Sequence, residues 1–125
     1  KLHIGNLEAK RDWGFAKDYC LAMWLMLQQE KPDDYVIATC EARSVKEFLE
    51  AAFDYVGLNW KKYVVIDKKL YRPAEVNILK GDFSRAKKKL CWQPTVNFEN
   101  LVKMMVDADL ERLKKANVAI DNVED

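Results

Sequence analysis

The sequence predicts an α/β fold, or α+β when this piece is taken alone, with four helices and two short strands. Four stretches place apolar residues at helical spacing, and two short apolar runs, 35–39 and 63–66, have the length of strands. The chain has 125 residues, half of them apolar and a third charged, which is typical of one globular domain with a sizeable core. Two strands make a poor sheet by themselves. We therefore expect this piece to pack against something larger.

The first part of the chain predicts a strand, a helix and a second strand. Leu2-His3-Ile4 is typical of a truncated strand. Asp12 is placed to cap a helix over 14–29, which Pro32 and the acidic pair after it would close. The residues expected on the buried face of this helix are Ala16, Tyr19, Cys20, Met23, Trp24 and Leu27. The apolar run 35–39 predicts a buried strand.

A second helix is predicted from its own start and stop signals. Ser44 and Glu47 have the spacing of a capping box, and Gly57 is expected to end the helix in the left-handed conformation. The residues expected to face inward are Val45, Phe48, Leu49, Ala52, Phe53 and Val56.

The rest of the chain predicts a strand, an extended turn and two helices. Residues 63–66 form the β-branched strand, and Arg72 must be extended because a proline follows it. Asp82 or Ser84 caps a short helix through Leu90. Asn97 caps the last long helix, whose buried stripe is expected to be Phe98, Leu101, Val102 and Met105. We expect a binding domain over 1–116 and a polar, frayed tail over 117–125.

Composition disfavours several classes of function. The 21 basic and 20 acidic residues give a net charge of +1, whereas a nucleic-acid surface normally shows a basic excess. Lys87-Lys88-Lys89 is more typical of a solvated helix face. With three dispersed cysteines and one histidine, we expect no metal site and reduced thiols in a cytoplasmic protein, Cys20 being buried. No apolar run has membrane-spanning length, and no signal peptide opens the chain.

Two arginines are candidates for binding a diphosphate. Arg11 lies just before a predicted helix N-terminus, and Pro73 fixes the backbone that presents Arg72. Each guanidinium can grip phosphate oxygens bidentately, while Glu75 can accept hydrogen bonds from ribose hydroxyls. The alternatives are structural: Arg11 could pair with Asp12 or another carboxylate, and Arg72 with Glu75.

Asn6 and Lys10 are weaker candidates for the same site. Asn6 lies where a strand edge could meet a base, and Lys10 adds positive charge near Arg11. Asparagine in a turn often bonds its own backbone instead, so both residues could be merely structural.

Three segments together resemble a known family. GNLEAKRDWG, YRPAEV and GDFSRAKKKL followed by Trp92 and Pro94 are similar to the C-terminal, substrate-binding part of GDP-mannose 4,6-dehydratases, which belong to the extended short-chain dehydrogenase/reductase (SDR) superfamily with its Rossmann-type fold. The similarity runs from Gly5 to about Leu113. It implies that Arg11 and Arg72 contact the diphosphate and that Glu75 contacts the guanosine ribose.

The resemblance also implies an activity and partners. Enzymes of this family are NADP-dependent lyases that convert GDP-mannose to GDP-4-keto-6-deoxymannose and water, on the way to GDP-fucose. We expect a homo-oligomer whose interface lies mostly outside this chain. The chain contains no G-x-G-x-x-G turn and no Tyr-x-x-x-Lys pair on a plausible catalytic helix. We therefore expect the NADP site and the catalytic residues to lie elsewhere, and this chain alone to be inactive.

Two other functions remain open at the level of sequence. The chain could be a non-catalytic nucleotide-binding or interaction module, including a gene remnant that still folds. It could also be a fragment of another nucleotide-sugar epimerase or reductase.

Three residues depart from the pattern of the family that the chain resembles. Cys40 and Cys91 stand where glycine is usual, and Asn77 stands where aspartate is usual. If the two cysteine positions require positive φ, each cysteine costs on the order of a kilocalorie per mole.

Overall fold

The computed structural model describes residues 1–121, with side chains through residue 116. It contains the four predicted helices, two short 3-10 helices and four short strands. The helices are α1 (Ala16–Leu27), α2 (Val45–Tyr55), α3 (Ser84–Leu90) and α4 (Phe98–Asp121). The 3-10 helices are η1 (Trp60–Lys62) and η2 (Lys68–Leu70). The strands are β1 (Leu2–Ile4), β2 (Lys10–Arg11), β3 (Arg43–Ser44) and β4 (Val64–Ile66).

The strands form two separate two-stranded sheets. β1 pairs in parallel with β4, so the predicted strands at both positions are confirmed. β2 pairs antiparallel with β3, in a register that sets Lys10 opposite Ser44. The prediction of a strand over 35–39 is wrong, because the described residues offer that segment no ladder partner. Only part of the segment is buried: Ala38 is buried, Tyr35 and Ile37 lie half-buried against the cluster around Trp92, and Val36 is exposed.

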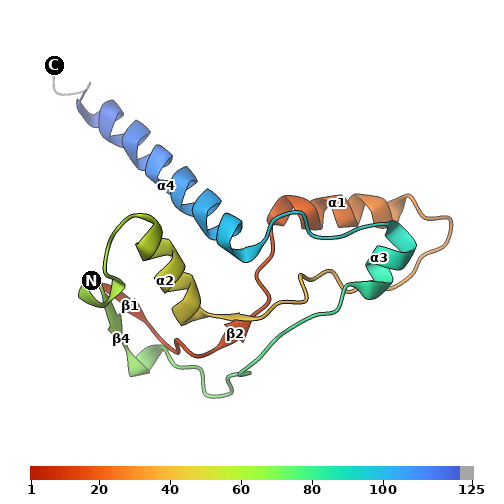
Figure 1. The fold of residues 1–125 in the computed structure, drawn as a ribbon, viewed down its shortest axis with the longest axis horizontal. Coiled ribbons are helices and arrows are strands. Elements are labelled where there is room, and N and C mark those ends of the chain that lie inside the picture. The colour runs from red at the N-terminus through yellow and green to blue at the C-terminus, as the bar shows by residue number, and fades with distance from the viewer. Residues whose placement is uncertain (122–125) are drawn as a thin grey trace.

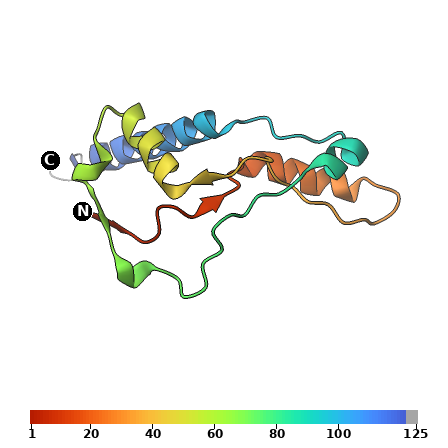
Figure 2. The ribbon, with the colours of Figure 1, turned by 60° about the horizontal axis from the view of Figure 1, so that its bottom comes forward.

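The elements are arranged around two small cores rather than one. α1 and α3 lie at one end of the molecule, and α2, β1 and β4 lie at the other, while α4 begins against α2 and projects beyond it (Figures 1 and 2). The core between α1 and α3 consists of Ala22, Ala86, Leu90 and Trp92. The core between β1, α2 and β4 consists of Leu7, Leu49 and Val64. β2 and the segment that follows η2 connect the two ends.

α1 presents a different face to the core from the one that its apolar residues predict. Met23, Trp24 and Leu27 are 60%, 57% and 81% exposed, and Cys20 is also exposed. The buried residues of the helix are Asp18 and Ala22. The prediction of the buried face is therefore wrong, and so is the burial of Cys20, although Tyr19 is half-buried as expected.

A buried carboxylate explains this orientation of α1. Asp18 accepts hydrogen bonds from the backbone N–H of Thr95 at 2.8 Å and from its hydroxyl at 2.7 Å. The Asp18 carbonyl also accepts from the indole N–H of Trp92 at 2.8 Å. Because a buried charge is tolerated only when it is hydrogen-bonded, these partners fix which side of α1 faces inward.

Asp12 does not cap α1, contrary to the prediction. The N-cap residue is Phe15, which makes no side-chain capping bond. The Asp12 carboxylate instead accepts from the backbone N–H and the hydroxyl of Thr39 at 2.8 and 2.7 Å, and from the N–H of Gly81 at 3.2 Å. Asp12 therefore ties together two distant loops.

The caps of α2 and α4 are confirmed. Ser44 and Glu47 form the reciprocal capping box, and the hydrogen bond from the Ser44 backbone lowers the pKa of the Glu47 carboxyl. Gly57, just beyond α2, has φ of +70°. The side chain of Asn97 accepts from the backbone N–H of Asn100 at 2.9 Å, at the start of α4.

The remaining helical predictions hold in part. The N-cap of α3 is Phe83, which makes no side-chain capping bond, so the predicted cap at Asp82 or Ser84 is wrong. Asp82 instead accepts from the backbone N–H of Ser84 at 2.8 Å, just ahead of the helix. The inward stripes of α2 and α4 are largely confirmed, but Val56 and Met105 are 38% and 47% exposed. The backbone of α4 stays helical through Asp121, past the expected start of the tail, and 122–125 lie outside the described residues.

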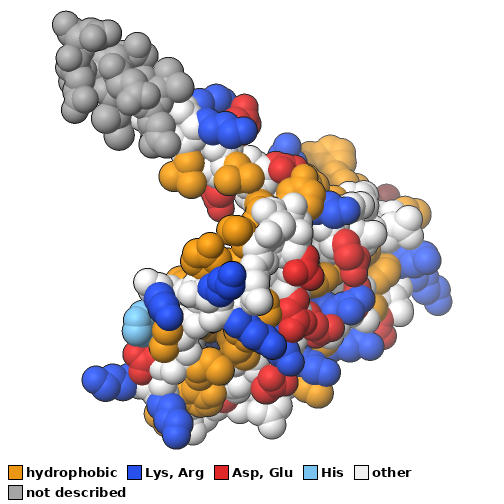
Figure 3. All heavy atoms as spheres, turned by 60° about the vertical axis from the view of Figure 1, so that its left-hand side comes forward, with side chains coloured by type: hydrophobic (Ala, Val, Ile, Leu, Met, Phe, Trp, Pro, Cys, Tyr) orange, Lys and Arg blue, Asp and Glu red, His pale blue; other side chains and the backbone are white. Residues whose placement is uncertain are grey.

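The surface mixes charges of both signs. On the face drawn in Figure 3, basic and acidic side chains are interspersed with hydrophobic ones. No helix in the described part of the chain has the length and apolarity needed to cross a membrane.

Cys40 and Cys91 both adopt the left-handed backbone conformation. Their φ values are +62° and +54°, and they are the non-glycine residues with positive φ among those described. The condition that the sequence left open is therefore met at both positions. Cys91 is the C-cap of α3, and its side chain is exposed.

Replacing Cys91 with glycine is expected to raise the free energy of unfolding of this chain by about 0.5–1 kcal/mol. Glycine relieves the left-handed strain, and an exposed side chain takes little packing with it. Cys20→Gly is the matched control, because Cys20 is also exposed but lies within α1, where glycine should cost about 0.3–0.5 kcal/mol. Urea unfolding followed by circular dichroism measures both. A loss above about 1 kcal/mol for Cys91→Gly would show that Cys91 makes packing contacts that stabilise the cap.

Candidate functional site

Four of the five predicted binding residues line one hollow in the surface. The hollow has a volume of about 220 Å³, and Asn6, Arg11, Arg72 and Glu75 are part of its wall. The rest of the wall is formed by Ile4, Gly5, Ala9, Val45 and Leu70. Lys10 is exposed and does not line the hollow, so the structure does not bring it together with the other four.

Backbone pairing on both sides of β2 positions Arg11. On one side, β2 pairs with β3. On the other side, the N–H of Lys10 donates to the Asn77 carbonyl at 2.8 Å, and the N–H of Leu79 donates to the Lys10 carbonyl at 3.1 Å. The segment that carries Glu75 is therefore joined to the strand that carries Arg11.

The side chain of Arg11 binds this same segment. One terminal nitrogen, Nη1, donates to the carbonyl of Val76 at 2.8 Å and to that of Lys10 at 2.8 Å. The other, Nη2, forms an ion pair with Oε1 of Glu75. The structural alternative for Arg11, pairing with a carboxylate, is thus observed, with Glu75 rather than Asp12 as the partner.

Arg72 is in a different state from Arg11. Its side chain is exposed, and it forms no ion pair or hydrogen bond with any described residue. The local Arg72–Glu75 pair that the sequence left open is therefore not present. A guanidinium at the rim of the hollow is available to an anionic ligand.

Asn6 bonds its own turn, as the structural alternative anticipated. Its side-chain oxygen accepts from the backbone N–H of Glu8 at 2.9 Å. The amide NH₂ of Asn6 is the donor that this arrangement leaves for a ligand.

Gly5 is a site residue that the sequence reasoning missed. A Cβ at this position would lie 2.7 Å from the carbonyl oxygen of Leu70, so only glycine lets the two walls of the hollow approach this closely. The signal in the sequence was the glycine itself, at the junction between a strand and the turn that carries Asn6.

A second hollow of about 460 Å³ lies on the other side of Arg11. Arg11, Asp12 and Tyr19 contribute to its wall, together with Val36, Ile37, Ala38, Leu79, Lys80 and Gly81. Burial raises the pKa of Tyr19, and the nearby charges of Asp12 and Asp18 raise it further. Arg11 therefore lines both hollows.

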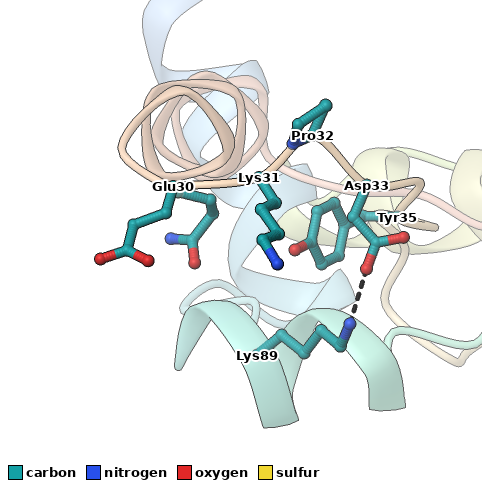
Figure 4. A pocket seen from close by; sticks show the side chains of 7 residues that line it. Glu30, Lys31, Pro32, Asp33, Tyr35 and Lys89 are labelled. Atoms are coloured by element: carbon teal, nitrogen blue, oxygen red, sulfur yellow. Dashed lines mark hydrogen bonds and ion pairs between the residues drawn. The ribbon is translucent and has the colours of Figure 1, made fainter.

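A larger pocket lies far along the molecule, between the end of α1 and α3, and has a volume of about 520 Å³ (Figure 4). Asp33, at its centre, accepts from Nζ of Lys89 at 2.7 Å and also pairs with Arg85. These hydrogen bonds, the one from Lys89 first, hold the pKa of the Asp33 carboxyl well below its usual range. Asp33 is thus already paired with two basic side chains, and none of the predicted site residues lines this pocket.

The hollow around Arg11 has the chemistry of an anion site but is small. Sites for small molecules usually measure about 300–1,000 Å³, so a hollow of about 220 Å³ would hold only part of such a ligand. Two guanidinium groups and a carboxylate could bind phosphate oxygens and hydroxyl groups side by side. Among the described residues, no three His, Cys, Asp or Glu side chains gather to hold a metal ion.

Comparison with known proteins gives a consistent result. The sequence profile of the GDP-mannose 4,6 dehydratase family matches residues 1–105. The chain is 64% identical over 121 residues to GDP-mannose 4,6 dehydratase 1 of Arabidopsis thaliana, an alignment that covers 97% of this chain and 34% of that protein. It is 48% identical over 128 residues to GDP-mannose 4,6 dehydratase of Homo sapiens, covering 89% of this chain and 34% of that protein. The chain spans about a third of the length of these curated relatives.

The fold is also found in solved structures. The structure of RMD from Pseudomonas aeruginosa complexed with NADPH matches with a TM-score of 0.74 at 19% identity, covering 85% of this chain and 34% of that chain. This likeness shows the fold alone, an α/β arrangement that this chain shares with part of that structure. The family itself is shown by the profile match and by the close relatives. This chain belongs to the GDP-mannose 4,6-dehydratase family.

Proposed function

We propose that this chain is the part of a GDP-mannose 4,6-dehydratase that binds the GDP moiety of GDP-mannose. One observation carries the proposal: Arg11 lines a single hollow together with Arg72 and Glu75, which come from one segment much further along the chain. Membership of the dehydratase family supplies the substrate that such a hollow would recognise. The enzyme as a whole would convert GDP-mannose to GDP-4-keto-6-deoxymannose and water.

Each residue has a role that follows from its state in the structure. Arg72 is exposed and unpaired among the described residues, so its fork would grip the diphosphate. Arg11 uses three of its five N–H groups within the chain, which leaves two for a phosphate oxygen. Glu75 would accept from the ribose hydroxyls, the NH₂ of Asn6 would donate to the base, and Lys10 would add positive charge nearby.

The cofactor would be NADP, held by other parts of the enzyme. The four glycines of this chain do not make a dinucleotide cradle: Gly5, Gly14 and Gly81 are packed against Leu70, Tyr19 and Ala38, and Gly57 follows the end of a helix rather than preceding one. The NADPH complex of the structural relative is consistent with a nicotinamide cofactor for this fold. The binding energy of the GDP moiety would position the hexose of GDP-mannose against that cofactor.

We propose that the enzyme is a cytoplasmic homo-oligomer. The three cysteines are free thiols, which fits a reducing compartment. We place the oligomer interface mostly outside this chain.

The test uses a hybrid enzyme, in which this chain replaces the matching segment of the Arabidopsis dehydratase, because 64% identity favours a correct fit to the remainder. Arg72→Ala is expected to weaken GDP binding by about 2–4 kcal/mol, measured by calorimetry, since it removes a charge-assisted bidentate contact. Arg72→Lys should recover only part of this loss, because it keeps the charge and loses the fork.

Lys69→Ala is the control for nearby charge, because Lys69 is exposed in η2 and does not line the hollow. It should leave GDP affinity nearly unchanged. If GDP binds equally well to the hybrid and to its Arg72→Ala variant, the assignment of the diphosphate to this hollow is wrong.

A further inference from the structure

We propose that Arg11 is a positioning residue for Glu75, and that through this contact it sets the enzyme's preference for a ligand with ribose hydroxyls. The inference rests on the proposed GDP site and adds a second role for Arg11 beyond attraction of the diphosphate. It concerns one contact, the ion pair between Arg11 and Glu75, which joins residues 64 positions apart.

The geometry of the pair leaves half of the carboxylate available. Oε1 of Glu75 accepts from Nη2 of Arg11, and among the described residues Oε2 has no hydrogen-bond donor. The side chains of Arg11 and Glu75 are only 26% and 19% exposed, so neither turns freely into solvent. Glu75 lines the hollow with one oxygen held by Arg11, which leaves the other to accept from a hydroxyl group of a ligand.

Arg11 makes the side-chain contacts that hold this part of the chain. Within the segment 72–76, the described hydrogen bonds are the two that Arg11 donates, to the Val76 carbonyl and to Glu75. Arg72, Pro73 and Ala74 are exposed. Backbone hydrogen bonds at Asn77 and Leu79 hold the chain just beyond this segment. Within it, the orientation of the Glu75 carboxylate depends on Arg11.

Arg11 itself is on a rigid support. Its strand, β2, is paired with β3 and bridged to Ile78 on its other edge. A planar guanidinium that donates to a carbonyl and a carboxylate at once fixes both distance and angle, which an ammonium group cannot do. Loss of Arg11 should free Glu75 and reduce its contribution to ribose binding without removing the carboxylate.

The measurement compares GDP with 2′,3′-dideoxy-GDP as ligands of the hybrid enzyme. The two share base and diphosphate and differ only in the ribose hydroxyls. Unmodified hybrid should bind GDP about tenfold or more tightly than the dideoxy analogue, since hydrogen bonds to a charged group are lost in the analogue. In Arg11→Ala the ratio should fall to about twofold or less, as it should in Glu75→Ala, and the double variant should lower it no further.

Three further variants separate positioning from other effects of Arg11. Arg11→Lys should give an intermediate ratio. Arg72→Ala should weaken both ligands equally and keep the ratio. Lys10→Ala removes the neighbouring positive charge on the same strand and should also keep the ratio, because Lys10 does not line the hollow.

Different experimental results would contradict the positioning role of Arg11 and the proposed GDP site. If Arg11→Ala weakens both ligands by the same factor and keeps the full ratio, Arg11 acts on the diphosphate alone and the positioning role is overturned. A general folding defect would likewise lower both affinities without changing the ratio. If Arg72→Ala does not affect GDP binding, or if the hybrid does not bind GDP, the GDP site itself is wrong.

Discussion

Replacing Trp92 with alanine is expected to lower the free energy of unfolding of this chain by about 3–5 kcal/mol. Trp92 is 2% exposed and lies at the centre of the core between α1 and α3. Its ring packs edge-on against Phe83 with centroids 5.8 Å apart, and against Tyr19 at 6.4 Å. Alanine would leave a cavity and remove the indole donor to the Asp18 carbonyl. Because domains are stable by only about 5–15 kcal/mol, this loss is a large part of the total stability.

A second tryptophan provides the matched control. Trp24 lies on α1 but is 57% exposed, so Trp24→Ala should change the free energy of unfolding by no more than about 0.5 kcal/mol. Trp92→Phe keeps most of the side-chain volume and loses the hydrogen bond. Its loss in free energy of unfolding should lie between those of Trp92→Ala and Trp24→Ala. Urea unfolding followed by circular dichroism measures all three. Equal effects of the alanine substitutions at Trp92 and Trp24 would contradict the assignment of Trp92 to the core.

Asp18→Ala is expected to lower the free energy of unfolding by about 2–4 kcal/mol. Removing a charged residue is costly here because that residue is buried and hydrogen-bonded. The carboxylate is 5% exposed and satisfies both the backbone N–H and the hydroxyl of Thr95. Alanine would leave these two donors without a partner in a partly buried place. It would also remove a negative charge from the first turn of α1, where the helix dipole favours it.

The size of the effect tests whether Asp18 is a lock between two segments. Asp18→Asn keeps the volume and one acceptor oxygen but turns an NH₂ group toward a donor, so it should cost less than alanine and still be clearly destabilising. Asp54→Ala is the control, because Asp54 is an exposed acidic residue of α2. Its effect on urea unfolding should be within about 0.5 kcal/mol. An Asp18→Ala variant as stable as Asp54→Ala would show that the contacts with Thr95 do not hold α1 in place.

The sequence by itself predicted the helices, because their signals are local. The capping box of Ser44 and Glu47, the cap at Asn97 and the left-handed Gly57 involve residues within three positions of their targets. Such contacts form wherever the helix forms, so sequence spacing is enough to find them. The strain at Cys40 and Cys91 was likewise expected from single positions.

The tertiary structure alone decided the orientation of α1 and the absence of a strand over 35–39. α1 carries apolar residues on more than one side, so periodicity did not identify the buried side. The choice depends on Asp18, whose partner Thr95 is 77 residues away. Residues 35–39 are mostly apolar, but a strand also needs a partner that forms a ladder of backbone hydrogen bonds, and no described residue forms one with them.

At the candidate site too, the sequence identified which residues are involved, and only the structure showed which of them pair with one another. The sequence identified Asn6, Arg11, Arg72 and Glu75, and the structure brings these four to one hollow, while their role in binding GDP stays a prediction. It could not show that Glu75 pairs with Arg11 instead of Arg72, three positions away. An ion pair forms with whichever charge the folded backbone brings into reach, and here the pairing of β2 with the segment around Ile78 brings Arg11 to Glu75. Local chemistry therefore determined which residues could bind a ligand, and long-range backbone pairing decided which of them hold one another.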